Sequence, residues 1–293
     1  MTKKIITTEF HLKQINLVLG YIHSNFITNI NANDLAKIGG YSIFHFHRIF
    51  KEIVGQNIDE YIRNTRLEKT SNLLIYNQHK TIEQIAIDSG FSTATGFTNA
   101  FKKKFGMTPK EWRKGGYESN TSKQITMITI DENMKIHSPQ IVKEKNISMM
   151  YMRIFGYEKN ISDIWNKMYE WADEFNISKK IQRHIGLFHN HPSFYPYNKA
   201  RYLACIQTEE NIFGNGNLGK CTISEGRFAK FNFKCTHSEL YKMMHLAYIE
   251  WLPTSNYEVR NFPAYVEYNN PENLLTNDVL ECDFFMPIQL INK

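Results

Sequence analysis

Apolar residues in the first third of the chain recur at steps of three and four, which is the spacing of one face of an α-helix. This pattern predicts a helix that ends near Phe26 and a second, long helix over Ile58–Tyr76. We therefore expect residues 1–115 to form an all-α domain. The apolar positions that carry the prediction are Leu12, Ile15, Leu19 and Ile22 in the first helix, and Ile58, Ile62, Leu67, Leu73 and Leu74 in the long one.

A segment of this helical region occurs twice. Residues 35–42 (LAKIGGYS) recur as residues 85–92 (IAIDSGFS), and their Ala, Gly and Ser positions coincide. After the serine the second copy is longer by one residue, and Phe50-Lys51 then matches Phe101-Lys102. Each copy predicts a helix, a tight turn at glycine, an N-cap at Ser42 or Ser92, and a second helix. This order is typical of a helix-turn-helix unit, so we expect two units joined by the long helix.

The second helix of each copy has two different faces. A charged stripe alone is usually a solvated face, but two stripes on the second helices of a repeated hairpin favour contact with DNA. In the first copy, the core side holds Phe46, Ile49, Phe50 and Ile53, and the opposite side holds Phe44, His47, Arg48 and Lys51. In the second copy, the core side holds Phe97, Phe101 and Phe105, and the opposite side holds Thr95, Asn99, Lys102 and Lys103.

Charge separates the two parts of the chain. Residues 1–124 hold 17 Lys and Arg against 10 Asp and Glu, whereas residues 125–293 hold 18 against 19. The N-terminal part alone is therefore suited to a polyanionic partner. The opening residues lack the apolar stretch of a signal peptide, and no segment is apolar enough to span a bilayer. With four single cysteines and no CxxC pair, the sequence indicates a soluble cytoplasmic protein without membrane contact.

The remainder alternates strand-like and helix-like segments after a polar linker over residues 116–127. Residues 140–144 and 148–154 predict a hairpin, 161–175 a helix, and 201–206 and 227–233 strands. A capping box from Thr236 to Glu239 opens a helix that ends near Trp251, and 264–268 and 281–288 predict closing strands. We therefore expect a multi-domain chain whose residues 128–293 form an α+β domain of two similar strand-pair and helix halves.

The N-terminal residues resemble the AraC/XylS family of transcription regulators over about residues 8–115. This resemblance implies a rigid pair of recognition helices that enter successive major-groove segments of promoter DNA, about 34 Å apart. It also implies RNA polymerase as a partner. The resembling positions are Ala36, Gly40, Tyr41, Ser42, Phe46, Arg48, Phe50, Lys51, Gly55, Tyr61, Arg66, Leu67, Leu73, Leu74, Ile85, Ala86, Gly90, Phe91, Phe97, Phe101, Lys102, Gly106, Pro109, Trp112 and Arg113.

Side-chain chemistry assigns a role to each exposed position on these helices. Arg48 and His47 would reach base edges, arginine favouring guanine, and Phe44 would pack on thymine methyl groups. The second copy has shorter side chains at its reading positions, so we expect the first half-site to be read more stringently. Those reading positions are Ala94, Thr95 and Asn99, and the phosphate-binding lysines are Lys51, Lys102 and Lys103.

The C-terminal residues resemble the GyrI-like effector-binding domain. The resemblance implies a small-molecule pocket between two halves, often one for hydrophobic cations, and it makes the whole chain a one-component regulator. The residues that carry it are Trp165, His191-Pro192, 201–205, 251–257, 262–268 and Met286-Pro287-Ile288.

Glu267 is the residue we expect to bind the cation, because it interrupts an apolar, aromatic strand where an ionised carboxylate needs a positive partner. Rings nearby in the sequence could add cation–π contacts. The alternative is a half-exposed Glu267 paired with Arg260 or Lys230. The predicted ring-bearing residues are Tyr265, Tyr268, Trp165 and Trp251, with Tyr157 on the loop after the first hairpin.

The sequence favours no enzyme, cofactor or metal. His184, His189 and His191 have no Cys or carboxylate at a matching spacing, and the glycine-rich stretch 214–219 lacks the helix that a dinucleotide site requires. Two other functions stay open for the C-terminal domain. It could bind another protein, or it could be a hydrolase in which Glu267 does acid–base work.

Overall fold

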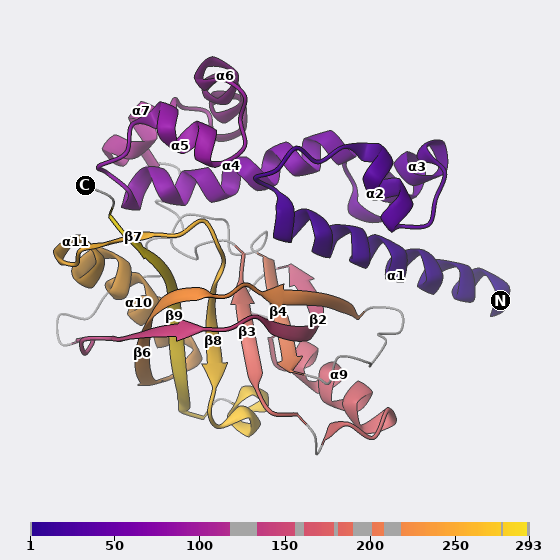
Figure 1. The fold of residues 1–293 in the computed structure, drawn as a ribbon. Coiled ribbons are helices and arrows are strands. Elements are labelled where there is room, and N and C mark those ends of the chain that lie inside the picture. The colour runs from indigo at the N-terminus through magenta and orange to yellow at the C-terminus, as the bar shows by residue number, and fades with distance from the viewer. Residues whose placement is uncertain are drawn as a thin grey trace.

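The computed structural model describes residues 2–117, 134–155, 161–178, 181–189, 201–207, 218–276 and 278–291. A helical N-terminal part lies against a C-terminal part built on an antiparallel sheet with flanking helices (Figure 1). This confirms the predicted change from an all-α region to an α+β region. The predicted linker lies outside the described residues from 118 onward.

The helical part follows the predicted periodicity closely. The long predicted helix is confirmed from Ile58 to Tyr76 as α4. Left-handed glycines end the two helices that carry the exposed stripes, Gly55 with a φ of 80° and Gly106 with a φ of 78°. The helices are α1 (Thr2–Asn25), α2 (Ala32–Ile38), α3 (Ile43–Val54), α4 (Ile58–Tyr76), α5 (Ile82–Asp88), α6 (Ala94–Phe105) and α7 (Pro109–Glu111), followed by a π-helical turn, η1 (Trp112–Gly116).

The serine caps differ from the prediction. Ser42 stands at the N-cap position of α3, but its side chain makes no capping hydrogen bond. At α6 the cap is Thr93 and not Ser92, because the extra residue of the second copy moves the helix start by one position. The Thr93 hydroxyl accepts a hydrogen bond from the Gly96 amide at 3.1 Å.

α4 belongs to two cores at once. Its first half packs with α1, α2 and α3, where Phe46 and Phe50 are fully buried. Its second half packs with α5 and α6, where Phe97 and Phe101 are fully buried. The Trp112 indole closes this second core and donates to the Ser71 carbonyl at 3.0 Å. The orientation of the two helix pairs is therefore set by one continuous helix.

The C-terminal part is a sheet with helices on its outside. Three strands that the sequence analysis missed, β3, β5 and β7, belong to it. Its elements are β1 (Gln140–Glu144), β2 (Ile147–Phe155), α9 (Ile161–Glu174), β3 (His184–Phe188), β4 (Arg201–Gln207), β5 (Gly219–Ile223), β6 (Gly226–Cys235), α10 (His237–Leu246), η4 (Ala247–Trp251), α11 (Leu252–Thr254), β7 (Tyr257–Val259), β8 (Ala264–Tyr268), the 3-10 turn η5 (Pro271–Leu275) and β9 (Leu280–Leu290).

The predicted hairpin between residues 140–144 and 148–154 is wrong. β1 pairs with β6, and β2 pairs with β4 and β5. The stretch β1–β2 runs antiparallel to β5–β6 in a single register, from Gln140 opposite Lys230 to Tyr151 opposite Gly219. Because β4 and β9 flank this ribbon on its two sides, the sheet closes on itself into a barrel.

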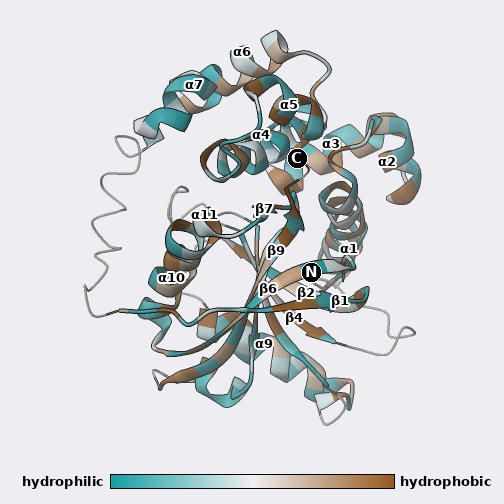
Figure 2. Ribbon diagram, turned by 60° about the vertical axis from the view of Figure 1, so that its left-hand side comes forward, coloured by the Kyte–Doolittle hydropathy of each residue, from teal (hydrophilic) through white to brown (hydrophobic). Residues whose placement is uncertain are grey.

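Closure gives the sheet an inner and an outer face. The inner face buries Tyr265, Phe285, Phe228 and Tyr151, and the Tyr265 and Phe285 rings stack with their centroids 4.4 Å apart. The outer face packs against α9 and α10 through residues such as Trp165. Hydrophobic segments accordingly concentrate on the strands and on the helix sides that meet them (Figure 2).

The described helices include none that is both long and apolar enough to cross a bilayer.

Two phenylalanines of α3 provide a test of this packing. Phe46→Ala should destabilise the helical part by about 3–5 kcal/mol, because it leaves a cavity in the core. Phe44 is 87% exposed, so Phe44→Ala should change stability by no more than about 0.5 kcal/mol. Urea denaturation followed by far-UV circular dichroism measures both. Equal losses for the two variants would contradict the assigned faces of α3.

Candidate DNA interface and ligand sites

The predicted DNA-contacting residues of α3 share one exposed face. Phe44, His47, Arg48 and Lys51 are all exposed, whereas Phe46, Ile49 and Phe50 are buried on the opposite side. α3 and α6 both lie on the side of the helical part that faces away from the sheet (Figure 1). An exposed phenylalanine beside arginine and histidine is suited to base edges and thymine methyl groups.

α6 presents a similar face with smaller side chains. Thr95, Asn99, Lys102 and Lys103 are exposed, and Ala94 is half-buried. The three lysines at the end of the helix, Lys102 to Lys104, do not share one role. Lys104 turns inward and donates to a Glu68 carboxylate oxygen at 2.8 Å. Of these three lysines, Lys102 and Lys103 stay on the exposed face, where the sequence analysis predicted phosphate contacts.

Glu68 lies at the centre of a charged cluster between the two parts of the chain. One carboxylate oxygen accepts from Lys104, and the other is paired with Arg201 at the start of β4. Arg201 also donates to the Tyr61 hydroxyl at 3.0 Å. Glu68 is 8% exposed and Arg201 is 6% exposed. A buried carboxylate is stable only with such partners, so this cluster fixes the helical part against β4.

The sequence analysis did not identify this cluster. Glu68 and Lys69 look like the polar side of an amphipathic helix, and Arg201 belongs to a strand 133 residues away from Glu68. No local pattern links them. The one available signal was the fully apolar run that follows Arg201 in β4, which leaves an arginine at the edge of a buried strand.

Two histidines and a lysine lie beside this cluster. The His23 and His189 rings are 4.4 Å apart between centroids, and the buried Lys69 ammonium donates to the His189 carbonyl at 3.0 Å. Burial, with the nearby charges of Lys69, Arg201 and Arg153, lowers the pKa of His189 well below its usual value. Burial and the charge of His189 do the same to the pKa of His23. Both rings are therefore neutral at pH 7.

A second ion cluster joins the end of α4 to β7. Glu258 is 3% exposed, and its oxygens meet His79 at 2.6 Å and Lys80 at 3.2 Å. The Asn77 amide beside it exchanges two hydrogen bonds with the backbone of Val259, at 3.0 and 3.1 Å. Backbone amide groups at this junction are thus satisfied across the two parts of the chain.

The predicted ligand residues do not form one site. Tyr265 and Glu267 alternate with Val266 and Tyr268 along β8, so they point to opposite faces of the sheet. Tyr265 lies on the inner face, whereas Tyr268 lies on the outer face, against which Trp165 of α9 packs. The two-residue period of a strand therefore contradicts a single aromatic cage around Glu267.

Trp165 of α9 forms a hydrogen-bonded chain with two tyrosines on the outer face of the sheet. The Trp165 indole donates to the Tyr202 hydroxyl at 3.0 Å, which lies 3.2 Å from the Tyr268 hydroxyl. All three side chains are buried. Trp251 packs elsewhere on the same face, edge-on to Phe231. These aromatic residues therefore contribute to the core between the sheet and its helices.

Glu267 already has a cationic partner, and it is neither of the two considered. Arg183 donates from Nε and Nη2 to both carboxylate oxygens, at 2.6 and 2.5 Å, and reaches Glu144 at 3.3 Å. Burial disfavours the guanidinium charge, but the hydrogen bonds and charge of Glu267 outweigh it and raise the pKa of Arg183. Lys230 instead pairs with Asp283, and Arg260 donates to the Glu225 carbonyl.

Some predictions fall outside the described residues. Tyr157 and His191 are among these positions. Within the ranges that the structure describes, no group of three or more His, Cys, Asp or Glu side chains is placed to hold a metal ion.

The chain matches two protein families. Residues 35–115 match a helix-turn-helix domain, and residues 137–289 match the GyrI-like small molecule binding domain.

Three curated proteins illustrate the similarity. The HTH-type transcriptional regulator YbfP of Bacillus subtilis is 34% identical over 36% of this chain and 35% of its own length. The probable transcription factor PqrA of Proteus vulgaris is 34% identical over 36% of this chain and 88% of its length. The transcriptional regulator Rob of Salmonella typhimurium is 22% identical over 89% of this chain and 92% of its length. The chain thus spans about a third of YbfP and nearly all of Rob.

Acid should loosen the contact between the two parts. The pKa of His189 is lowered in the folded protein, so the unfolded chain binds more protons below its ordinary value of about 6.5. The contribution of neutral His189 to the free energy of unfolding is therefore present above that pH. It decreases by about 1–2 kcal/mol as the pH falls towards 5. Thermal unfolding by calorimetry between pH 5 and pH 8 measures the loss.

Two variants separate His189 from general acid effects. His189→Gln cannot gain the proton, so its stability should depend less steeply on pH than that of the wild type. The exposed His47 serves as the control, and His47→Gln should keep the wild-type slope. Identical slopes for all three proteins would show that His189 does not carry the effect.

Proposed function

Because the chain belongs to the AraC/XylS family of DNA-binding transcription regulators and carries a GyrI-like small molecule binding domain, we propose that an effector held by its C-terminal domain controls its binding to promoter DNA. In this proposal residues 1–115 form the DNA-binding domain with two helix-turn-helix units, and residues 128–293 form an effector domain with two similar halves. The regulator would act with RNA polymerase in the cytoplasm.

The observation that carries the DNA-binding half of this proposal is the matched exposure of α3 and α6. Each helix buries phenylalanines on one side and exposes polar or basic side chains on the other. α4 holds the two helices through both cores, so a single chain offers two reading heads in a fixed arrangement. Arg48, which is exposed and carries five donors, is the residue best suited to read guanine.

Arg48→Ala should reduce discrimination between operator and non-operator DNA by about 1–3 kcal/mol, because it removes a base contact. Lys102→Ala should weaken binding to all DNA sequences alike, because it removes one phosphate contact. The slope of log K against the logarithm of the salt concentration should fall by about one. Fluorescence polarisation with a pool of promoter fragments at two salt concentrations measures both effects. Lys167→Ala, exposed on α9, is the matched control and should bind as the wild type does. Unchanged selectivity in Arg48→Ala would reject the assigned role.

Sensing by the C-terminal domain is proposed to involve Glu267. A hydrophobic cation that binds there has to displace the Arg183 guanidinium from both carboxylate oxygens. Arg183 then acts as an internal competitor and limits affinity for cations. The same pairing does not favour a hydrolase, because the Arg183 guanidinium occupies the carboxylate that would have to contact a substrate. YbfP and Rob are named as transcriptional regulators, which supports a sensing role over a catalytic one.

Arg183→Met should raise affinity for tetraphenylphosphonium roughly tenfold or more, because it frees the Glu267 carboxylate. The double variant Arg183→Met with Glu267→Gln should lose this gain. Equilibrium dialysis against the intact protein measures the affinities, and circular dichroism verifies the fold of each variant. If affinity follows neither substitution, the cation site is not at Glu267.

A further inference from the structure

Three sulfur-bearing side chains come together on the inner face of the barrel. Cys205 of β4, Met149 of β2 and Cys221 of β5 all pack in the inner core. β2 lies between the other two strands, since it pairs with β4 on one side and with β5 on the other. The three residues therefore occupy neighbouring strands and point to the same side of the sheet.

The strand register brings these side chains close to one another. Met149 is directly opposite Cys221, and side chains in that relation have Cβ atoms about 4.5–5.5 Å apart. Cys205 is opposite Tyr151, which makes it a diagonal neighbour of Met149 and places it within reach of that long side chain. Because the inner face of a barrel is concave, side chains from the strands on either side of β2 converge on Met149.

The two thiols interact across β2 but are not placed to form a disulfide. Burial raises the pKa of the Cys205 thiol well above its usual value, and the neighbouring Cys221 thiol adds to the effect. Two strand spacings put their Cα atoms about 9–10 Å apart, whereas a disulfide requires no more than about 7 Å. A bridging metal ion spans a longer gap, because each metal–sulfur bond adds about 2.3 Å.

A small pocket between α1 and the barrel gives access to Cys221. Cys205 and Met149 are fully buried, whereas Cys221 is half-buried and lines this pocket. The volume of the pocket is about 20 Å³, which is room for about one water-sized group. The pocket therefore admits a metal ion and excludes an organic ligand.

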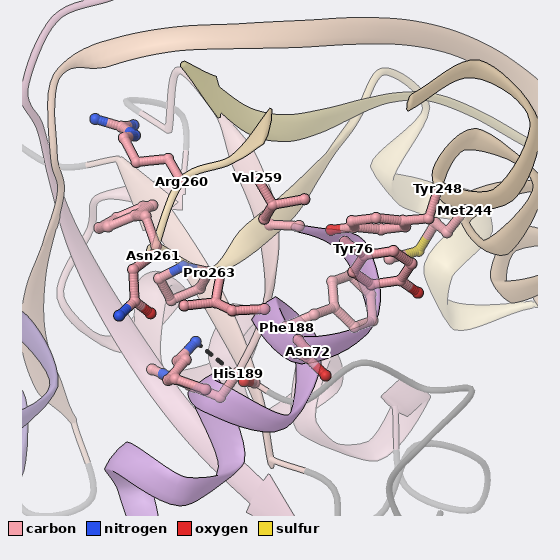
Figure 3. A pocket seen from close by; sticks show the side chains of 14 residues that line it. Asn72, Tyr76, Phe188, His189, Met244, Tyr248, Val259, Arg260, Asn261 and Pro263 are labelled. Atoms are coloured by element: carbon pink, nitrogen blue, oxygen red, sulfur yellow. Dashed lines mark hydrogen bonds between the residues drawn. The ribbon is translucent and has the colours of Figure 1, made fainter. Parts of the chain in front are cut away.

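A neighbouring pocket shows that the thiols face the α1 side alone. His189 and Pro263 line both pockets and separate them. Among the residues that line the neighbouring pocket, Met244 is the one that carries sulfur, and it lies beside Tyr248 (Figure 3). That pocket has no thiol in its lining, so it does not offer a comparable set of soft ligands.

We propose that Cys205, Met149 and Cys221 bind a soft monovalent metal ion, Cu(I), in an all-sulfur site. Thiolate and thioether ligands select Cu(I), whereas Mg²⁺ and Ca²⁺ prefer oxygen and a structural Zn²⁺ site takes four ligands. Each thiol loses its proton when it binds, so the bound ion replaces two protons and the site gains one negative charge. The Arg153 guanidinium, 5.4 Å from the centre of the Tyr151 ring, supplies positive charge nearby.

The strand that carries Cys221 is also the strand on which α1 rests. A Cβ atom at Gly20 of α1 would lie 2.9 Å from the Lys220 carbonyl, so the helix approaches β5 as closely as a glycine allows. The Tyr151 hydroxyl donates to the Asn16 carbonyl of α1 at 3.3 Å. An ion that draws Cys221 towards Met149 therefore acts on the support of α1, which packs in the same core as α3.

Anaerobic titration of the full-length protein with Cu(I), in competition with bicinchoninate, tests the site. The protein should withdraw a single Cu(I) per chain from the coloured complex, and copper K-edge X-ray absorption should show sulfur ligands alone. Failure to compete for Cu(I), or a copper ion bound by nitrogen or oxygen, would overturn the proposal.

Variants locate the copper ion. Even the outer partners of a metal site change affinity by about 10–100-fold, so loss of a ligand in Cys221→Ala should weaken Cu(I) binding by roughly 100-fold or more. Met149→Leu keeps the volume of the side chain and removes the thioether, and it should weaken binding by about tenfold. Circular dichroism and thermal melting verify that each variant is folded. Wild-type affinity in both variants would reject the site.

The second pair of thiols provides the matched control. Cys235 and Cys282 lie on β6 and β9, and both are buried in the core on the outer face of the barrel. Neither lines the pocket beside Cys221. The double variant Cys235→Ala with Cys282→Ala should therefore bind Cu(I) as the wild type does. A loss of binding in this variant would place the ion at the outer pair and contradict the proposal.

Two further measurements separate this site from its surroundings and from the proposed function. His189→Gln should leave Cu(I) affinity unchanged, and a loss in that variant would assign the metal to the imidazoles beside the pocket instead. Cu(I) should slow amide hydrogen exchange in β5 of the wild type and not in Cys221→Ala. Neither result depends on DNA or on Glu267, so failure of the proposed function and failure of the copper site are distinguishable.

Discussion

The arrangement of the whole molecule depends on one buried carboxylate. Glu68 is held by Lys104 from α6 and by Arg201 from β4, so a single side chain on α4 joins α6 to the barrel. Removing either cation would leave Glu68 buried with too few partners, which proteins tolerate poorly. The docking of the two parts is therefore specified by this ion cluster, together with the Asn77–Val259 hydrogen bonds and the stacked Tyr76 and Tyr248 rings.

α4 has three roles in this arrangement. Its first half is part of the core around Phe46 and Phe50, its second half is part of the core around Phe97 and Phe101, and its remaining face meets the C-terminal part. A change on that last face is transmitted to both cores, because one rigid helix spans them. For the proposed function, α4 would provide a physical route between an effector and DNA that needs no separate hinge.

Aromatic and charged residues that look alike in the sequence lie on opposite faces of the barrel. Its inner face carries the Glu144–Arg183–Glu267 ion group near one end and stacked rings further in. Its outer face carries the Trp165–Tyr202–Tyr268 chain against α9. The strand alternation on β8 was available from the sequence and already separates Tyr265 from Tyr268.

The sequence by itself determined the features that arise from local periodicity. The faces of α3 and α6, the bounds of α4 and the capping box at Thr236 all follow from residues within a turn or two of one another. Only the tertiary structure decided which strands pair with β1 and β2, which cation meets Glu267, and that Glu68 and Lys69 are buried. The Arg183–Glu267 and Glu68–Arg201 contacts join residues 84 and 133 positions apart. Their strength depends on burial and distance, which no local pattern of residues encodes.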